Sequence, residues 1–148
     1  PDICLRTTLI TGFPGETEED HQILLDFIDE MEFDRLGVFT YSPEEDTKAA
    51  SLDNQVDEEV KLCRKDEIME LQQEISMDKS ERLIGKEIEV IIEGKASDED
   101  VYVGRSYMDA PSVDGYVFIN SEEELMSGDF AKVRIVKAME YDLIGDLI

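Results

Sequence analysis

The pattern of apolar and polar residues begins with a strand, a helix and a second strand. Residues 4–11, CLRTTLIT, and residues 36–41, LGVFTY, are rich in β-branched and apolar side chains and predict two strands. Between them, residues 18–31 predict a helix that Thr17 caps, with Asp20 three residues later as the capping-box acid. Its apolar residues recur at helical spacing in one stripe of Ile23, Leu24, Phe27, Ile28 and Met31. Short joins predict a βαβ unit with parallel strands and a right-handed crossover.

A longer helix and a change of period follow. Residues 57–79 predict the helix, with Val60, Ile68, Leu71 and Ile75 near helical spacing. From residue 86 the period becomes two, and strands are expected at 86–94, 101–107, 115–119, 130–136 and 141–148. Five strands in about 65 residues predict a small antiparallel barrel of the OB kind. The expected fold class is therefore α/β plus all-β, with a boundary near residues 80–85.

The predicted βαβ unit needs additional structure around it. Two parallel strands cannot cover their own edges and faces, because parallel sheets are normally buried on both sides. We therefore expect the rest of a parallel sheet to come from a longer chain or from another chain.

Charge narrows the choice of partners. The 148 residues carry 38 acidic and 14 basic side chains, a formal net charge of −24. Such a chain repels phosphate backbones and favours a strongly basic partner, although a charge that only keeps the protein dispersed is an equally open reading. No segment has the length of a membrane span and no signal peptide is visible, so a cytoplasmic protein is expected. Cys4 and Cys63 fit neither a disulfide framework nor a metal cluster.

The stretch ITGFPGETEED at residues 10–20 predicts a tight corner between strand and helix. It lacks the Gly-Lys-Ser/Thr of a P-loop and the G-x-G-x-x-G of a dinucleotide site. Alternation in the preceding strand places Arg6, Thr8 and Ile10 on one face, away from the face that packs on the helix. A bound cofactor could supply polar contacts for Arg6 and Thr8, and a structural ion pair for Arg6 is the alternative.

A second tract, GRSYMDAPSVDG at residues 104–115, leads into a loop braced by Pro111. It predicts either a recognition edge on the barrel or a structural hairpin loop. The lone His21 is expected to lie on the surface or in helix packing, with no role as a ligand or base.

Four stretches carry a resemblance to a known family: RTTLITGFPGETEED, FTYSPEEDT, ELQQEIS and GRSYMDAP. Together they resemble the C-terminal half of the radical-SAM methylthiotransferases, and most the branch that modifies an aspartate of a small-subunit ribosomal protein. The resemblance implies the C-terminal part of a partial TIM barrel at residues 1–55, a linking helix at 56–82 and a TRAM domain at 83–148. It also implies that S-adenosyl-L-methionine and two [4Fe–4S] clusters serve the full-length parent. The C-x-x-x-C-x-x-C cluster motif is absent here, so this part alone is expected to retain no cofactor, to hold no catalytic or metal-ligating residue and to be inactive.

The resemblance also implies where the sites lie. Arg6, Thr8, Ile10 and Gly12 would line the S-adenosylmethionine side of the barrel, and Arg105, Tyr107, Asp109 and Asp114 would contact the substrate. The acidic tract fits a basic ribosomal protein as partner and makes direct nucleic-acid binding unexpected. A tRNA-modifying methylthiotransferase whose TRAM domain binds tRNA, and a non-enzymatic acidic adaptor, are the alternatives.

Overall fold

The computed structural model describes residues 3–96 and 100–148. The chain forms two compact units, Pro1–Ile75 and Ser76–Ile148. Each unit has its own hydrophobic cluster.

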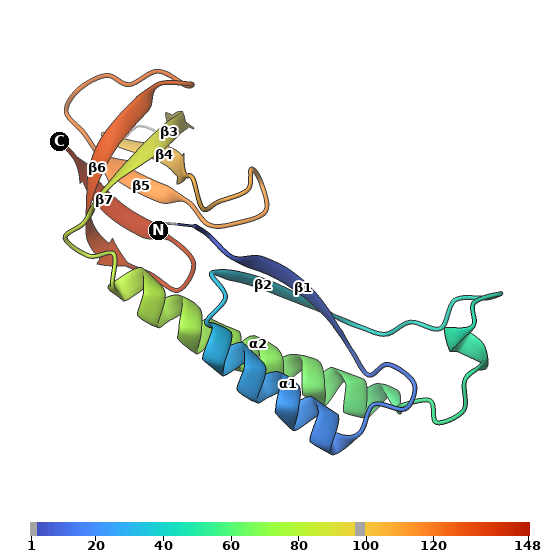
Figure 1. The fold of residues 1–148 in the computed structure, drawn as a ribbon. Coiled ribbons are helices and arrows are strands. Elements are labelled where there is room, and N and C mark those ends of the chain that lie inside the picture. The colour runs from blue at the N-terminus through green and yellow to red at the C-terminus, as the bar shows by residue number, and fades with distance from the viewer. Residues whose placement is uncertain (1–2, 97–99) are drawn as a thin grey trace. The chain divides into compact units, whose positions relative to one another are not determined.

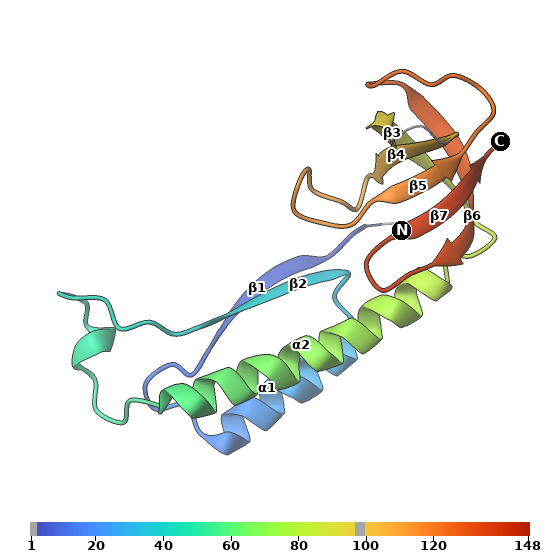
Figure 2. The same ribbon diagram turned by 180° about the vertical axis from the view of Figure 1, so that it is seen from behind.

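The first unit is a parallel strand pair with helices on one face. Its elements are β1 (Arg6–Thr11), α1 (Glu18–Met31), β2 (Arg35–Thr40), the 3₁₀ turn η1 (Ala49–Ser51) and most of α2 (Glu58–Glu81). β1 and β2 pair in parallel, from Arg6 opposite Arg35 to Thr11 opposite Thr40. Figures 1 and 2 show α1 and α2 side by side along this strand pair. The strand–helix–strand order and the parallel pairing match the prediction.

Helix α1 begins and ends where its sequence predicts. The Thr17 hydroxyl accepts a hydrogen bond from the Asp20 N–H at 3.1 Å, and the Asp20 carboxylate accepts one from the Thr17 N–H at 2.9 Å. These two bonds form a capping box. The Asp20 carboxylate accepts hydrogen bonds from the Thr17 N–H and, at 2.8 Å, from the Thr17 hydroxyl, and these hold the pKa of Asp20 below its usual value. The helix ends at Glu32, whose φ of 43° is left-handed and whose N–H bonds to the Ile28 carbonyl.

The buried face of α1 differs from the predicted stripe. Ile28 is fully buried against residues of β2 and α2, and Leu24 packs alongside it, whereas Ile23, Phe27 and Met31 are exposed. His21 is buried instead. The predicted stripe was therefore wrong. The buried face of the helix contains His21 as well as Ile28, and a pattern of apolar residues does not reveal a buried histidine. The remaining members of the cluster are Val38, Ile68 and Ile75, with Leu9, Leu25, Leu36 and Leu71 packed around them.

The second unit is a closed five-stranded barrel. Its strands are β3 (Glu87–Lys95), β4 (Val101–Ser106), β5 (Val117–Asn120), β6 (Phe130–Ala138) and β7 (Leu143–Leu147). They close in the order β3-β4-β5-β7-β6 (Figure 1).

The barrel is mixed, which corrects the antiparallel barrel expected from sequence. β5 and β7 run parallel, with Val117 opposite Leu143, while the other neighbouring pairs are antiparallel. Strand direction can alternate all the way around a closed ring only when the number of strands is even. A closed ring of five strands must therefore contain a parallel pair.

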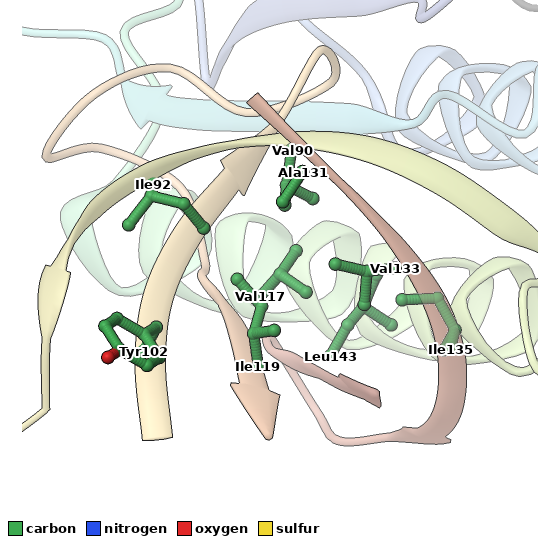
Figure 3. Close-up of a cluster of buried hydrophobic side chains, with 9 residues drawn as sticks. All are labelled: Val90, Ile92, Tyr102, Val117, Ile119, Ala131, Val133, Ile135 and Leu143. Carbon is green, nitrogen blue, oxygen red and sulfur yellow. The ribbon is translucent and has the colours of Figure 1, made fainter. Parts of the chain in front are cut away.

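The interior of the barrel is apolar. Alternate residues point inward along each strand, as Ala131, Val133 and Ile135 do on β6. Figure 3 shows the cluster that these side chains form: Val90, Ile92, Tyr102, Val117, Ile119, Ala131, Val133, Ile135 and Leu143. The core is built within the unit and uses all five strands.

Candidate functional site

The corner between β1 and α1 is closed by a carboxylate. Gly12 has a φ of +75°, and its N–H donates to both oxygens of Glu16 at 3.0 Å. The Thr11 hydroxyl donates to Glu16 Oε1 at 3.3 Å. Glu16 thus folds back over the end of β1, in a turn that left-handed glycine backbone permits.

Two buried cationic side chains of α2 reach this corner. The Arg64 Nη1 atom donates to Glu16 Oε1 at 2.7 Å, and Nη2 lies 3.3 Å from Glu18 Oε2. Lys61 donates from Nζ to the Tyr41 carbonyl at 3.1 Å and to Glu58 Oε1 at 2.5 Å. Arg64 thereby offsets part of the negative charge of Glu16 and Glu18 at this corner.

These cations change the predicted packing of α2. Ile68 and Ile75 are buried as expected, but Val60 is exposed and Lys61 and Arg64 continue the buried line toward the start of the helix. The pattern missed them because lysine and arginine are rarely buried unless paired. Their partner Glu16 lies 48 residues from Arg64, so no local spacing signals the pair.

His21 joins α1 to α2. Its Nε2 atom lies 2.7 Å from Glu67 Oε2, and this hydrogen bond lowers the pKa of Glu67. The Cys63 thiol lies 3.5 Å from the other Glu67 oxygen, which raises the pKa of the thiol and makes it a poor nucleophile. The helix-packing reading of His21 agrees with this geometry. Across residues 3–96 and 100–148, no three or more His, Cys, Asp or Glu side chains gather in a way that could hold a metal ion.

The open face of the β1–β2 pair carries three of the predicted cofactor residues. Arg6, Thr8 and Ile10 alternate with Leu9, which packs against the helices, and the Ile10 side chain is 59% exposed. Opposite Ile10 in the parallel register lies Phe39, 62% exposed. Phe39 was not among the residues predicted for the site, although alternation within residues 36–41 places it on this face.

This face exposes the apolar side chains of Ile10 and Phe39 next to the polar residues Arg6 and Thr8. Exposed apolar side chains of this kind are typical of a surface that a ligand or further protein structure covers. Gly12, the fourth predicted residue, lies just beyond β1, and its N–H is already engaged by Glu16. Its part in a cofactor site would therefore be to shape the corner.

The four predicted substrate residues divide into two kinds. Arg105 pairs with Glu93 at 3.0 Å and donates to the Asp109 carbonyl at 3.3 Å. Asp109 is buried and accepts from the Ser106 hydroxyl at 2.5 Å, and Asp114 accepts from the Ala110 N–H at 2.5 Å. These bonds stabilise the loop that joins β4 to β5. The Tyr107 side chain is 64% exposed and is the one of the four best placed for direct contact.

The β6–β7 turn packs against the β4–β5 loop. Gly115 lies so close to the Tyr141 carbonyl that a Cβ atom would overlap it, and the Tyr116 N–H donates to Asp142 Oδ1 at 2.7 Å. Tyr141 is exposed, and Glu140 raises the pKa of its phenol. This turn was not predicted, because the strand expected at residues 141–148 begins within it.

The second unit is similar to a known domain family. A family model described as TRAM domain matches residues 84–148. The barrel is a TRAM domain. Neither helix among the described residues is long and apolar enough to cross a membrane.

The whole chain is similar to proteins named ribosomal protein uS12 methylthiotransferase RimO. It is 55% identical over 145 residues to the one from Lachnoclostridium phytofermentans, covering 98% of this chain and 33% of that protein. It is 56% identical over 149 residues to the one from Pelotomaculum thermopropionicum, covering 100% of this chain and 34% of that protein, and 51% identical over 148 residues to the one from Clostridioides difficile, covering 100% and 33%. The chain therefore corresponds to the C-terminal third of these relatives, and the resemblance drawn from its motifs is confirmed.

Proposed function

We propose that this chain is the C-terminal part of a radical-SAM methylthiotransferase that adds a methylthio group to the β-carbon of an aspartate in ribosomal protein uS12. The observation that carries the proposal is the match of the whole chain to RimO proteins at 51–56% identity. Because the chain spans a third of their length, the activity belongs to the longer protein. Its expected place of action is the cytoplasm, where ribosomal proteins are made.

The first unit would contribute one wall of the cofactor site. S-adenosyl-L-methionine and two [4Fe–4S] clusters would supply the radical chemistry and the sulfur when bound to the longer protein. On this chain, the open face with Arg6, Thr8 and Ile10 would bind part of S-adenosylmethionine, with Phe39 beside Ile10. The free thiols of Cys4 and Cys63 do not form a cluster-ligand set, so we assign them no part in the reaction.

The TRAM domain would bind the basic protein substrate. Its β4–β5 loop and β6–β7 turn present Tyr107 and Tyr141, with the carboxylates of Asp114, Glu140 and Asp142 on the same two segments. Exposed aromatic side chains on segments that also carry carboxylates suit a lysine- or arginine-rich surface.

Charge pairing on the barrel argues against a polyanion as partner. Arg105 pairs with Glu93 at 3.0 Å, and Arg134 pairs with Glu87 at 2.7 Å. Since these arginines already contact carboxylates, phosphate binding would have to displace the pairs. This favours the ribosomal protein over tRNA.

The activity is tested with the full-length protein after its clusters have been loaded. Incubated with S-adenosylmethionine and purified uS12, it should add the mass of one methylthio group to a single aspartate, while tRNA under the same conditions stays unmodified. Modification of tRNA alone would transfer the assignment to the tRNA-modifying branch. Binding of uS12 without modification would favour the acidic adaptor.

The substrate surface is tested separately. Tyr107→Ala in the full-length protein should weaken uS12 binding about tenfold, the size typical of an interface hot spot. Met126→Ala is the control, because Met126 is equally exposed but lies in the loop that follows the far end of β5. Equal affinities for the two variants would remove the β4–β5 loop from the interface.

A further inference from the structure

Two charged side chains of α2 are buried where a helix normally places apolar residues. Lys61 is 2% exposed and Arg64 is 6% exposed. Burying a charge costs free energy unless close partners offset the lost hydration. Both side chains find these partners at one place, the end of the β1–β2 strand pair and the corner that follows it.

Arg64 fixes the carboxylate that closes the corner. Glu16 accepts hydrogen bonds from the Gly12 N–H at 3.0 Å, from the Thr11 hydroxyl at 3.3 Å and from Arg64 at 2.7 Å. The Glu16 side chain is only 14% exposed, so its orientation is set mainly by these donors and little by water. Arg64 also reaches the Glu16 carbonyl at 3.3 Å and thus holds the main chain of the corner as well as its side chain.

Lys61 fixes the two strand ends to each other. Its aliphatic stem fills the space beside Gly12, where an added Cβ would overlap Lys61 Cγ. Its Nζ atom donates to the Tyr41 carbonyl at 3.1 Å, and the Tyr41 N–H donates to the Thr11 carbonyl at 2.8 Å. One side chain therefore contacts the residue after β1 and the residue after β2.

We propose that Lys61 and Arg64 are positioning residues for the S-adenosylmethionine site: from α2 they hold the β1–α1 corner and the ends of β1 and β2 in the shape that cofactor binding requires. They act through Gly12, Glu16 and Tyr41. The inference rests on the proposed function, since the corner ends the strand whose open face is assigned to the cofactor. It gives α2 a second role besides joining the two units.

The test compares two methionine substitutions in the full-length protein with its clusters loaded. Arg64→Met removes the bonds to Glu16, and Lys65→Met removes the next positive charge of the same helix, for which the structure shows no ion pair among the described residues. We measure amide hydrogen exchange in the peptide covering residues 11–16 and the affinity for S-adenosylmethionine by equilibrium dialysis.

The expected result is a selective effect at the corner. Arg64→Met should speed exchange in residues 11–16 about tenfold and weaken S-adenosylmethionine binding about tenfold, the size of one lost hydrogen bond to a charged group. Lys65→Met should leave both unchanged. Arg64→Lys keeps the charge but loses the planar guanidinium that contacts Glu16 and Glu18 together. The affinity of this variant for S-adenosylmethionine should therefore lie between those of Arg64→Met and the unaltered protein. If Arg64→Met does not fold, Arg64→Lys and Lys61→Met, which retains the stem beside Gly12, supply the comparison.

Two outcomes overturn the proposal. Unchanged exchange in the Arg64 variants shows that the corner is held without this residue. Faster exchange with unchanged S-adenosylmethionine affinity shows a purely structural role. A failure of the proposed function looks different, because the unaltered protein then binds no S-adenosylmethionine while the exchange difference between Arg64→Met and Lys65→Met persists.

Discussion

The two units of this chain differ in how completely their strands are paired. In the TRAM domain each of the five strands has two neighbours, so the barrel has no open edge. In the first unit β1 and β2 have only each other, and one face of the pair leaves Ile10 and Phe39 exposed. Parallel strands are normally covered on both faces. The barrel therefore holds its structure by itself, whereas the first unit depends on its helices and leaves a surface for other structure.

The cores of the two units also differ in how much buried charge they contain. The central cluster of the barrel is apolar, with the buried Ser106 and Asp109 hydrogen-bonded to each other where β4 ends. The first unit is apolar around Ile28 and Ile68 and charged around Lys61 and Arg64. Apolar packing adds stability without specifying one fine arrangement, whereas a buried charged pair needs its partners in defined positions. We infer that the second unit is organised for stability and the first for the placement of a functional corner.

The largest expected effect is a difference between the two sheets in the free energy of unfolding lost when a strand side chain is truncated. Ile119→Ala removes a fully buried side chain from the barrel and should lower the free energy of unfolding by about 2–5 kcal/mol. Phe39→Ala removes a larger but exposed side chain and should cost about 0.5 kcal/mol or less. Urea denaturation measures both, followed by tyrosine fluorescence for the barrel and by the helical circular dichroism signal for the first unit. Similar losses would mean that the open face of β1–β2 is covered in solution.

The second prediction concerns the corner. Gly12→Ala introduces a side chain at positive φ and against Lys61, and should destabilise the first unit by about 2–4 kcal/mol. Gly15→Ala is the matched control, since Gly15 also has positive φ but nothing lies within 4 Å of an added Cβ. It should cost about 1 kcal/mol. Thermal unfolding followed by the helical circular dichroism signal distinguishes them, and equal costs would show that Lys61 does not pack against Gly12.

A smaller effect is expected at the start of α1. Thr17→Ala removes the hydroxyl that accepts from the Asp20 N–H and should cost about 1 kcal/mol. Thr17→Ser keeps the hydroxyl and should cost much less. The same thermal measurement applies, and a loss as large for serine as for alanine would point to the lost methyl group in place of the cap.

The smallest effect is a dependence on pH. The pKa of Glu67 lies below its usual 4.5 because of the hydrogen bond with His21, and the pKa of Asp20 lies below its usual 3.8 because of its bonds to Thr17. Depressed carboxyl pKa values stabilise the fold above the usual values and lose that contribution as pH falls through the lowered ones. The first unit should therefore weaken below about pH 4.5, and Glu67→Gln should flatten that slope. A slope unchanged by Glu67→Gln would remove the His21 contact as its source.

The sequence predicted what local pattern controls. Thr17 and Asp20 predict the start of α1, and alternation places Val133 and Ile135 inside the barrel. The parallel β5–β7 pair was missed because it follows from closing an odd number of strands, which no single segment records. The charged contacts of Arg64 were missed because its partner is distant in sequence, and lysine and arginine count as exposed in any pattern of hydrophobicity.

The candidate site was predictable in outline only. The open-face positions of Arg6, Thr8 and Ile10 follow from alternation in one strand. Phe39 opposite Ile10 depends on the register between two strands, which the sequence of either one does not contain. Their roles toward cofactor and substrate stay predictions until binding is measured.

Hydrogen exchange resolved by residue on the chain itself is the most direct test of the difference between the units. Amides of β6 inside the closed barrel, such as Val133 and Ile135, should exchange at least about 100-fold more slowly than hydrogen-bonded amides of β1 and β2, which open with the first unit. Equal protection in the two sheets would contradict the account, because it would mean that the paired strands of the first unit are as firmly held as the barrel.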